Sequence, residues 1–353
     1  MSVYVGVDFH VHSQTVFWCD TQDGVVNQRR LDHERDDVSI FYAQWPTPVT
    51  VGVESSGYAQ WFHRLVQEKG HRLLVGDAHA IRQFAKRRQK NDRRDAELLL
   101  DLLLHDDFPA VHVPAPVSRE ILDLLHHRER LVRMRTMLKN NLQAVALNHR
   151  VARGAKLFSA QGRQTLASLP LSSAEDRQRR DGFQLLEDLE QRIADLHAEL
   201  ELRAIPDIRV TRLRTHPGVG LLTGLAMVHT LEPLTRFQEG RQVAAYCGLD
   251  PVEHSSGETI RHRGISKQGN RLLRTLLVEA AWSAIRPHQD SDLRRFYFHL
   301  ASHKPAGVAI VAVARKLALR LFRMWKNGID YDEFRRRGRD VRCARGMTEA
   351  NSA

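Results

Sequence analysis

Cysteine is scarce in this sequence, and its placement excludes a structural metal knot. Only three cysteines occur among 353 residues, and Cys19, Cys247 and Cys343 lie far apart. Structural zinc sites need closely spaced cysteine pairs, and small secreted folds need many cysteines for disulfides. The sequence therefore predicts a protein of a reducing compartment that holds no cysteine-bound metal.

Long apolar runs are missing as well. The start MSVYVGVDFH has no basic segment followed by an apolar signal core, and no later run is long enough to span a bilayer. We therefore expect a cytoplasmic protein that has no membrane partner.

Acidic residues are outnumbered by basic ones. The 42 Asp and Glu face 53 Lys and Arg, which gives a formal net charge of +11 with histidine neutral. Such an excess attracts polyanions by releasing their condensed counterions, so nucleic acid is the first partner to consider. The alternative is a basic surface without a polyanionic partner. At 42% hydrophobic residues the chain can bury two cores, and its length favours two domains.

The first hundred residues alternate β-branched runs with amphipathic stretches. The predicted strands are 3–9, 15–20, 24–31, 49–54 and 71–76. The first three are joined by short polar turns and predict an antiparallel meander, whereas a helix over 58–69 between the last two predicts parallel pairing. A helix over 92–105 follows, rich in leucine and acidic at its start. Together these elements predict a mixed, five-stranded α/β sheet.

Prolines divide the remaining chain. Pro109, Pro114 and Pro116 mark a boundary, and Pro206 ends a helical region. The predicted parts are an α/β domain over 1–108, a helical linker over 109–205, a mainly helical domain over 206–330 and a basic, loosely ordered tail over 331–353. In the linker, an apolar stripe with spacings of three and four consists of Leu186, Leu189, Ile193, Leu196 and Leu200. It fits a dimerising coiled coil and equally an ordinary helix packed on its own domain.

Four carboxylates fall where one edge of the sheet would gather them. Asp8 ends the first predicted strand and Glu54 the fourth, whereas Asp92 and Asp95 lie three apart at a helix start. If the two strands are neighbours, Asp8 and Glu54 emerge side by side, and the helix presents its two acids on one face. Gathered carboxylates need cations, and hard oxygen ligands suit Mg²⁺ or Mn²⁺. Two such ions about 4 Å apart serve phosphodiester cleavage or strand transfer. Taken singly, each acid fits a turn, cap or surface position equally well.

A run of cations precedes the acidic helix. It consists of Lys86, Arg87, Arg88, Lys90, Arg93 and Arg94. Charge runs are usually solvated faces, but this one adjoins the predicted metal site, where a phosphate backbone would lie. We expect it to contact nucleic acid.

The C-terminal half offers a second set of chemically competent residues. The turn HPGVG before a helix at 216–220 resembles turns that hold phosphate through backbone N–H groups, although such turns also serve plain packing. Further on, HSSG is followed by a basic stretch. A serine on a turn acts as a nucleophile when cations match the charge that develops on a phosphoryl centre, and Ser256 fits that need. The candidate phosphate binders beside it are Arg261, Arg263, Lys267 and Arg271.

These motifs, in this order along almost the whole chain, resemble one family. They are GVDFH, GVESSG, DRRDAE, HPGVG, AAYCGLDP, HSSG and GISKQGNRLLR. The sequence is similar to DEDD-type (RuvC-like) transposases of the insertion-sequence 110/116/902 family. One departure is Asn91 before the acidic pair, where many relatives carry threonine. It leaves the carboxylates in place.

The resemblance implies a fold and a division of labour. It implies an RNase H-like (RuvC-like) N-terminal domain with the tetrad Asp8, Glu54, Asp92 and Asp95, a helical coiled-coil linker, and a mainly α C-terminal transposase domain. It places the catalytic serine on Ser256, with Ser255 as a neighbouring competitor. It further implies a homo-oligomer (dimer or tetramer) with a composite site between subunits, element-end and target DNA, a guide RNA encoded by the element, and action at the nucleoid of a bacterium.

Two rival functions remain open from the sequence. In a metal-dependent nuclease or resolvase, the tetrad does all the cutting and Ser256 is a loop residue. In a non-enzymatic nucleic-acid-binding protein, the acids are structural and binding depends on salt but not on Mg²⁺.

Overall fold

The computed structural model describes most of the chain, in two compact units. The described residues are 2–46, 48–84, 92–151, 156–256, 259–287 and 290–338, with backbone alone for residues 92, 253–256 and 259–263. The units are Met1–Val113 and Pro114–Ala353. The finer division into linker, C-terminal domain and tail stays a prediction. No helix of the described residues is long and apolar enough to cross a membrane.

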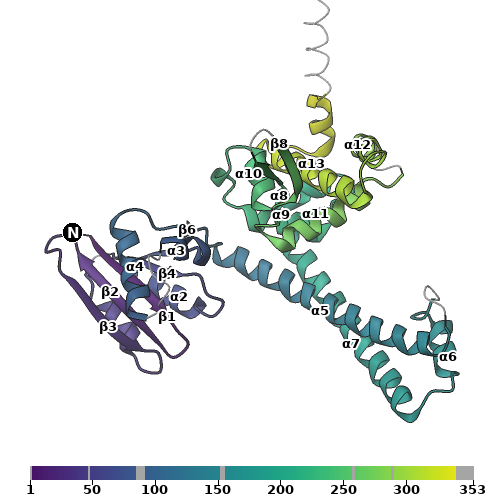
Figure 1. Ribbon diagram of the computed structural model, residues 1–353, viewed down its shortest axis with the longest axis horizontal. Helices are drawn as coiled ribbons and strands as arrows, with labels where there is room; N and C mark the ends of the chain where they lie inside the picture. Colours follow the sequence, from purple (N-terminus) through teal and green to yellow (C-terminus); the bar gives the residue numbers. More distant parts are fainter. Residues whose placement is uncertain are drawn as a thin grey trace, which may run out of the picture. The chain divides into compact units, whose positions relative to one another are not determined.

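The N-terminal unit is built on a mixed sheet of six strands (Figure 1). The strands are β1 (Val3–Phe9), β2 (Ser13–Asp20), β3 (Val26–Asp32), β4 (Thr50–Glu54), β5 (Arg72–Gly76) and β6 (Ala110–Val111), in the order β3-β2-β1-β4-β5-β6. The predicted meander β1–β2–β3 is antiparallel, and β4 runs parallel to both β1 and β5. The prediction of five strands missed β6, because two residues give no alternating pattern to recognise.

Helices cover the two faces of this sheet. They are α1 (Asp37–Ala43), α2 (Gln60–Glu68), α3 (Ala78–Phe84) and α4 (Asp92–Leu104). Alternate residues of a strand point to opposite faces. Val5 and Val7 of β1 pack in one cluster with residues of α1 and α2, whereas Tyr4 packs with Ala96 and Leu100 of α4. Helix α4 therefore covers the face opposite to α1 and α2.

Helix α4 lies directly against the backbone of β1. A Cβ atom placed on Gly6 would sit 2.4 Å from the backbone nitrogen of Leu100 and 2.5 Å from the carbonyl oxygen of Ala96. Gly52, the partner of Gly6 on β4, meets side chains instead: a Cβ atom there would sit 2.8 Å from a ring carbon of Phe108 and 2.9 Å from a methyl carbon of Leu103 in α4. Gly6 thus lets the backbones of α4 and β1 approach each other, and Gly52 leaves room for the side chains of Leu103 and Phe108.

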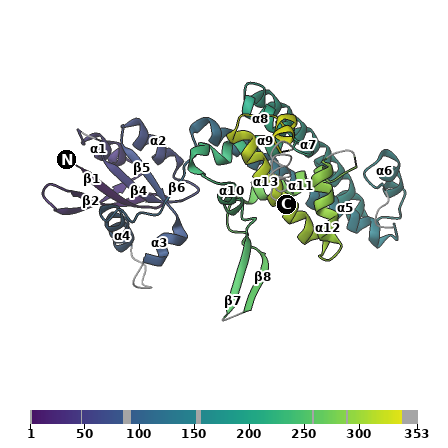
Figure 2. The same ribbon diagram turned by 90° about the horizontal axis from the view of Figure 1, so that it is seen from above.

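The C-terminal unit is mainly helical, as predicted. Its helices are α5 (Pro116–Asn148), α6 (Ala160–Ala167), α7 (Ser173–Ala204), α8 (Ile208–Arg214), α9 (Leu221–Leu231), the 3₁₀ turn η1 (Leu234–Arg236), α10 (Gly240–Tyr246), α11 (Arg271–Ala284), α12 (Ser291–Ala301) and α13 (Ala306–Lys326). Its described strands are β7 (Pro251–Ser256) and β8 (Thr259–Ile265), which form a hairpin that projects from the helices (Figure 2). Where the sequence predicts a loosely ordered tail, residues 331–338 are helical.

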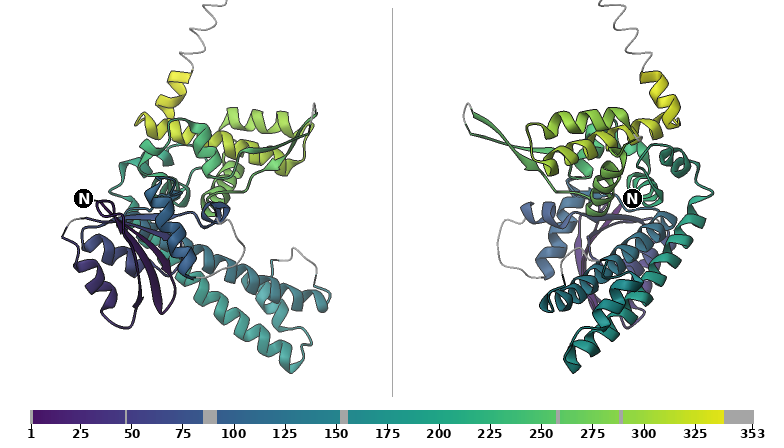
Figure 3. Two further views of the ribbon diagram at one scale, coloured as in Figure 1. Left: turned by 60° about the vertical axis from the view of Figure 1, so that its left-hand side comes forward. Right: turned by 90° about the vertical axis from the view of Figure 1, so that its right-hand side faces the viewer.

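The long helices α5 and α7 lie side by side and antiparallel (Figure 3). Near one end Glu120 pairs with Arg203 at 3.0 Å, and nearer the other Lys139 pairs with Glu190 at 2.8 Å. Within the predicted apolar stripe, every seventh residue is buried: Leu186, Ile193 and Leu200. Leu186 packs with Leu142 and Leu200 with Ile121, both from α5 of the same chain. Of the two alternatives, packing of the helix within its own chain therefore accounts for the buried residues of the stripe.

The glycine-rich turn before α9 serves packing. Gly218 has a φ of +86°, and a Cβ there would sit 2.5 Å from the backbone nitrogen of Ala284 in α11. Every residue of α9 from Leu221 is buried except Leu222. The sequence left open whether this turn grips phosphate or packs, and the contact with α11 favours packing.

We expect the close approach of α4 to make Gly6 intolerant of any side chain. Gly6→Ala places a methyl group against backbone atoms that cannot move aside without shifting the helix, so it should destabilise the protein by about 1–3 kcal/mol. Urea unfolding of the full chain measures the loss. Gly57→Ala is the control, because a Cβ at Gly57 meets nothing within 4 Å. Equal stability of the two variants would contradict this account of α4.

Candidate active site

Asp8 and Glu54 lie at the same edge of the sheet. The parallel register pairs Val7 of β1 with Val53 of β4, and the two acids are the next residues on each strand. Val7 and Val53 point into the α1/α2 core, so Asp8 and Glu54 fall on the opposite face, which α4 covers. The predicted neighbourhood of the first and fourth strands is confirmed.

The start of α4 brings the other two acids to the same face. Asp92 is the first residue of α4, and Asp95 precedes Ala96, whose carbonyl lies over Gly6. Gly6 is two residues before Asp8 and therefore on the same face of β1. Asp95 is half-buried, and the side chain of Asp92 lies outside the described residues. The backbone thus places Asp8, Glu54 and Asp95 on one face of the sheet. The fourth acid, Asp92, is the first residue of α4.

Two cationic or polar neighbours of these acids were not singled out from the sequence. His10 Nε2 lies 2.9 Å from Asp8 Oδ2, and Arg82 Nη2 lies 3.9 Å from Glu54 Oε1. Asp8 is the more protected carboxylate, with 18% of its side chain exposed against 42% for Glu54. His10 follows Asp8 in GVDFH, so a histidine two residues after a strand-ending acid was the available signal.

The described side chains do not by themselves form a metal cage. Among them, with Asp92 left out, no three Asp, Glu, His or Cys residues gather closely enough to hold an ion. The donor set nevertheless has the right chemistry, because carboxylate oxygens are the ligands that Mg²⁺ and Mn²⁺ prefer. Asp8 and Glu54 therefore fit a divalent cation by their chemistry and by their shared edge.

The predicted nucleic-acid contacts are described only in part. Lys86, Arg87, Arg88 and Lys90 lie outside the described residues, and the side chains of Arg261 and Arg263 on β8 do as well. Arg93 and Arg94 are exposed on the first turn of α4, and Lys267 and Arg271 are exposed before and at the start of α11. Four of the predicted cations thus stand at exposed positions next to the proposed reacting groups in sequence.

Ser256 is the last residue of β7. The hairpin register pairs Ser256 with Thr259 and Ser255 with Ile260, so successive residues Ser255 and Ser256 belong to opposite faces of the ribbon. Gly257 and Glu258 lie outside the described residues. The predicted loop serine therefore stands where the strand ends, and the two candidate serines occupy distinct positions.

The base of this hairpin is locked by two of the family motifs. From the GISKQGN segment, Ser266 donates its hydroxyl to Asp250 Oδ1 at 2.7 Å, and the backbone N–H of Asn270 donates to the carbonyl of Tyr246 at 2.9 Å. Gly269, with φ of +130°, approaches so closely that a Cβ would sit 2.3 Å from that same carbonyl of Tyr246. The segments before β7 and after β8 are thus held to one another.

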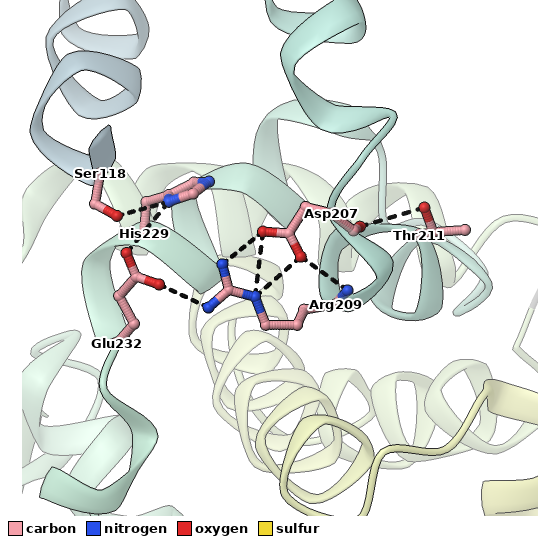
Figure 4. Close-up of polar contacts among 6 residues, drawn as sticks. All are labelled: Ser118, Asp207, Arg209, Thr211, His229 and Glu232. Carbon is pink, nitrogen blue, oxygen red and sulfur yellow. Dashed lines mark hydrogen bonds and ion pairs between the residues drawn. The ribbon is translucent and has the colours of Figure 1, made fainter. Parts of the chain in front are cut away.

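A buried Ser–His–Glu contact in this unit resembles a hydrolytic triad but is structural (Figure 4). His229 Nδ1 lies 2.9 Å from Ser118 Oγ and 3.5 Å from Glu232 Oε1. In a catalytic triad the serine and the carboxylate contact different ring nitrogens, whereas here both contact Nδ1. Ser118 and His229 are also 2% and 4% exposed, which excludes a polymeric substrate.

The same network joins three helices. Arg209 Nη1 donates to Glu232 Oε2 at 2.6 Å, and Arg209 Nη2 donates to Asp207 Oδ2 at 2.6 Å (Figure 4). Burial, the largest influence, lowers the pKa of His229, against the opposing pull of Glu232. Neutral His229 therefore links the first turn of α5 to α8 and α9.

A second buried cluster centres on Asp290. Its carboxylate accepts hydrogen bonds from Arg320 and, at 2.7 Å, from the Tyr331 hydroxyl, and it caps α12. His216 is 1% exposed, packs against the tilted ring of Tyr331, and donates Nδ1–H to the Pro217 carbonyl at 2.8 Å. Burial lowers the pKa of His216 to about 4, against the opposing pull of that carbonyl and of Asp290. Strongly shifted groups often mark active sites, but this one is enclosed.

We expect His216 to make the protein less stable in mild acid. Its pKa is about 4 when folded and near 6.5 otherwise, so the unfolded chain binds more protons between these values. The stability is full above pH 6.5 and falls as the pH drops towards 4, by at most roughly 3 kcal/mol. Unfolding free energies measured across this range should show a flatter profile for His216→Gln. The exposed His303→Gln should keep the wild-type profile, and an unchanged slope in His216→Gln would refute the assignment.

Comparisons with known proteins cover both halves of the chain. Residues 5–149 match the DEDD transposase model of the IS110 group, and residues 210–297 match the model described as transposase IS116/IS110/IS902 family. The chain is 29% identical over 321 residues to a Pseudomonas aeruginosa protein named "Probable family 20 transposase", covering 89% of this chain and 94% of that one.

Two further relatives carry insertion-sequence names. The chain is 30% identical to the transposase for insertion sequence element IS1111A of Coxiella burnetii, over 76% of this chain and 75% of that one. It is 27% identical to the transposase for insertion sequence element IS1328 of Yersinia enterocolitica, over 89% of this chain and 94% of that one. The chain therefore belongs to the IS116/IS110/IS902 family of transposases.

Proposed function

We propose that this transposase recombines DNA through Ser256 as nucleophile and through a divalent metal at Asp8, Glu54, Asp92 and Asp95, within an RNase H-like N-terminal domain. One observation supports the metal site: adjacent parallel strands carry Asp8 and Glu54 at their carboxyl ends, on the face that α4 covers. The strand order, with an antiparallel meander followed by parallel strands, is compatible with the RNase H-like arrangement.

The metal would supply charge neutralisation and a polarised phosphate oxygen when bound. The family suggests a divalent requirement, and Mg²⁺ or Mn²⁺ fits the carboxylate donors. The chain's own part is to hold these carboxylates at fixed positions. Strand β1 fixes Asp8, β4 fixes Glu54, and the packing of α4 on Gly6 fixes the level of Asp95.

The proposed chemistry breaks one phosphodiester bond but keeps its free energy in the phosphoserine bond. Ser256 Oγ attacks the phosphorus, so an Oγ–P bond forms and the bond from phosphorus to the 3′ oxygen breaks. The 3′ oxygen leaves with the bonding electrons and ends as a hydroxyl, since the serine proton is released in the same exchange. Attack of another strand's 3′ hydroxyl on the phosphoserine reverses the step, and no ATP is needed.

The exposed cations near the site favour DNA as its partner. Arg93 and Arg94 at the start of α4, and Lys267 and Arg271 at α11, stand where they would neutralise phosphates. We further propose that a guide RNA from the element selects the DNA and that the protein acts as a dimer or tetramer, with subunits sharing the site. Resemblance of the motifs supports these two points.

The serine mechanism predicts a covalent adduct. Purified protein with element-end DNA, element-derived RNA and Mg²⁺ should give a protein–DNA adduct that survives denaturing electrophoresis. Ser256→Ala should abolish it, because no other atom replaces Oγ, whereas Ser255→Ala should retain it. This neighbouring serine is the matched control, since it lies one residue away on the opposite face of the hairpin.

Other outcomes separate the rivals. Free cut ends in both wild type and Ser256→Ala would show a metal nuclease and refute the phosphoserine. Loss of the adduct in Ser255→Ala alone would move the nucleophile to Ser255. Salt-sensitive binding without any Mg²⁺-dependent product would leave a binding protein without catalysis.

The metal site predicts a contrast along one helix. Asp95→Asn should reduce adduct yield by about two orders of magnitude or more, because an amide does not replace a carboxylate charge beside a phosphate. Asp101→Asn, which changes an exposed acid further along α4, should leave the yield unchanged. Adduct formation followed over a Mg²⁺ titration measures both. Equal yields in the two variants would remove Asp95 from the site.

A further inference from the structure

A groove in the C-terminal unit gathers cations that the proposed chemistry does not use. It has a volume of about 1010 Å³ and runs along α12, α13 and the helical residues 331–338. Its charged lining consists of Arg295, Lys316, Arg320, Arg323, Arg335 and one carboxylate, Asp292. Five cations against one acid make this a strongly positive surface.

Helix α13 carries the central row of these charges. Lys316, Arg320 and Arg323 are spaced by four and three residues, so they lie on one face of the helix. Lys316 and Arg323 are exposed, whereas the Arg320 side chain is 13% exposed. The opposite face of α13, with Leu317 and Leu321, is in the core. The row is therefore fixed by the burial of the helix that carries it.

One buried carboxylate holds both walls of the groove. Asp290, 2% exposed, binds Arg320 of α13 and also accepts the Tyr331 hydroxyl at 2.7 Å. Tyr331 is the first of the helical residues 331–338, which include the lining residue Gly338. Because both walls share this anchor, the groove needs little rearrangement to receive a ligand.

The acid in the lining is already compensated. Asp292 lies 2.6 Å from Arg295 and 3.9 Å from Arg320. The Lys316 ammonium lies 4.2 Å from the centre of the Phe296 ring, and the Arg335 guanidinium lies 5.9 Å from the centre of the Tyr331 ring. A contact with an aromatic ring leaves the charge of the cation unneutralised. The exposed Arg323 and Arg335 thus offer positive charge to an external anion.

We propose that this groove binds the phosphodiester backbone of duplex DNA, apart from the phosphate that reacts. The inference rests on the proposed function in that DNA is the substrate. A continuous row of cations matches a polyanion, and phosphate contacts position a protein on a duplex without reading its sequence. An unpaired strand would need aromatic rings for stacking, and Phe334, half-buried, is the aromatic side chain in the lining.

Charge reversal on both walls tests this assignment. Arg323→Glu with Arg335→Glu, in the full chain, should weaken binding of a labelled random-sequence DNA duplex about tenfold or more at physiological salt. The salt dependence of the affinity should fall by roughly two phosphate contacts. Fluorescence anisotropy without Mg²⁺ measures binding alone, so a failure of the serine mechanism leaves this result readable.

Two controls separate charge from structure. Arg323→Lys with Arg335→Lys keeps the charge and should bind within about threefold of wild type at the same salt. Arg130→Glu with Arg192→Glu makes the same charge change at exposed positions of α5 and α7 and should change the affinity far less. Unchanged duplex DNA affinity in the groove variant would overturn the proposal, including the case in which its affinity for an RNA of equal length falls instead. Equal losses in the two charge-reversal variants would also overturn it.

Discussion

The N-terminal site depends on how closely one helix approaches one sheet. Helix α4 rests on the bare backbone of β1, because Gly6 places no side chain between them, and Gly52 of β4 leaves room for the side chain of Leu103. Side chains normally hold a helix well above a sheet, and removing them lets the backbones approach. The acids at the carboxyl ends of the strands and the acid on the first turn of α4 then lie on one face of the sheet. Leucines further along α4 hold the helix down by burial of apolar surface.

The C-terminal unit relies on a different kind of constraint, namely buried or partly buried polar side chains that bind two partners each. Asp290 binds Arg320 and Tyr331 at once, and Arg209 bridges Asp207 and Glu232. A buried carboxylate that loses a partner is costly to leave unpaired, so these clusters tolerate one arrangement of the helices. They fix the crossing of α12 and α13 and the attachment of α5 more specifically than apolar contact alone.

Much of the fold could be predicted from local patterns, and the exceptions have physical causes. Alternating valines gave β1 and β4, and the helix between β4 and β5 gave their parallel pairing. The partner of the α7 stripe could not be predicted, because a heptad pattern is the same whether the second helix belongs to another chain or to this one.

The candidate site could be predicted from the sequence only in part, because contacts between distant segments leave no local pattern. Acids that end strands were visible as Asp8 and Glu54, since strand ends are local features. The cations of the groove lie on α12, α13 and residues 331–338, and their proximity arises from Asp290, whose burial no local pattern announces. The basic residues after Tyr331 were noted as a tail, whereas the structure makes their first turns one wall of the groove.

The geometry of the hairpin that carries Ser256 bears on whether the free protein would cut DNA. Its sheet contains two strands, β7 and β8, and a two-stranded ribbon is only marginally stable in water without a third element against it. The segments at its base are locked, but the end of β7 lies at the far end from that lock. Under the proposed serine mechanism, Ser256 would be held firmly only when a partner molecule packs against the ribbon. The same mechanism would make the free protein a poor cutter of the DNA it meets, and reactivity would become a property of the assembled complex.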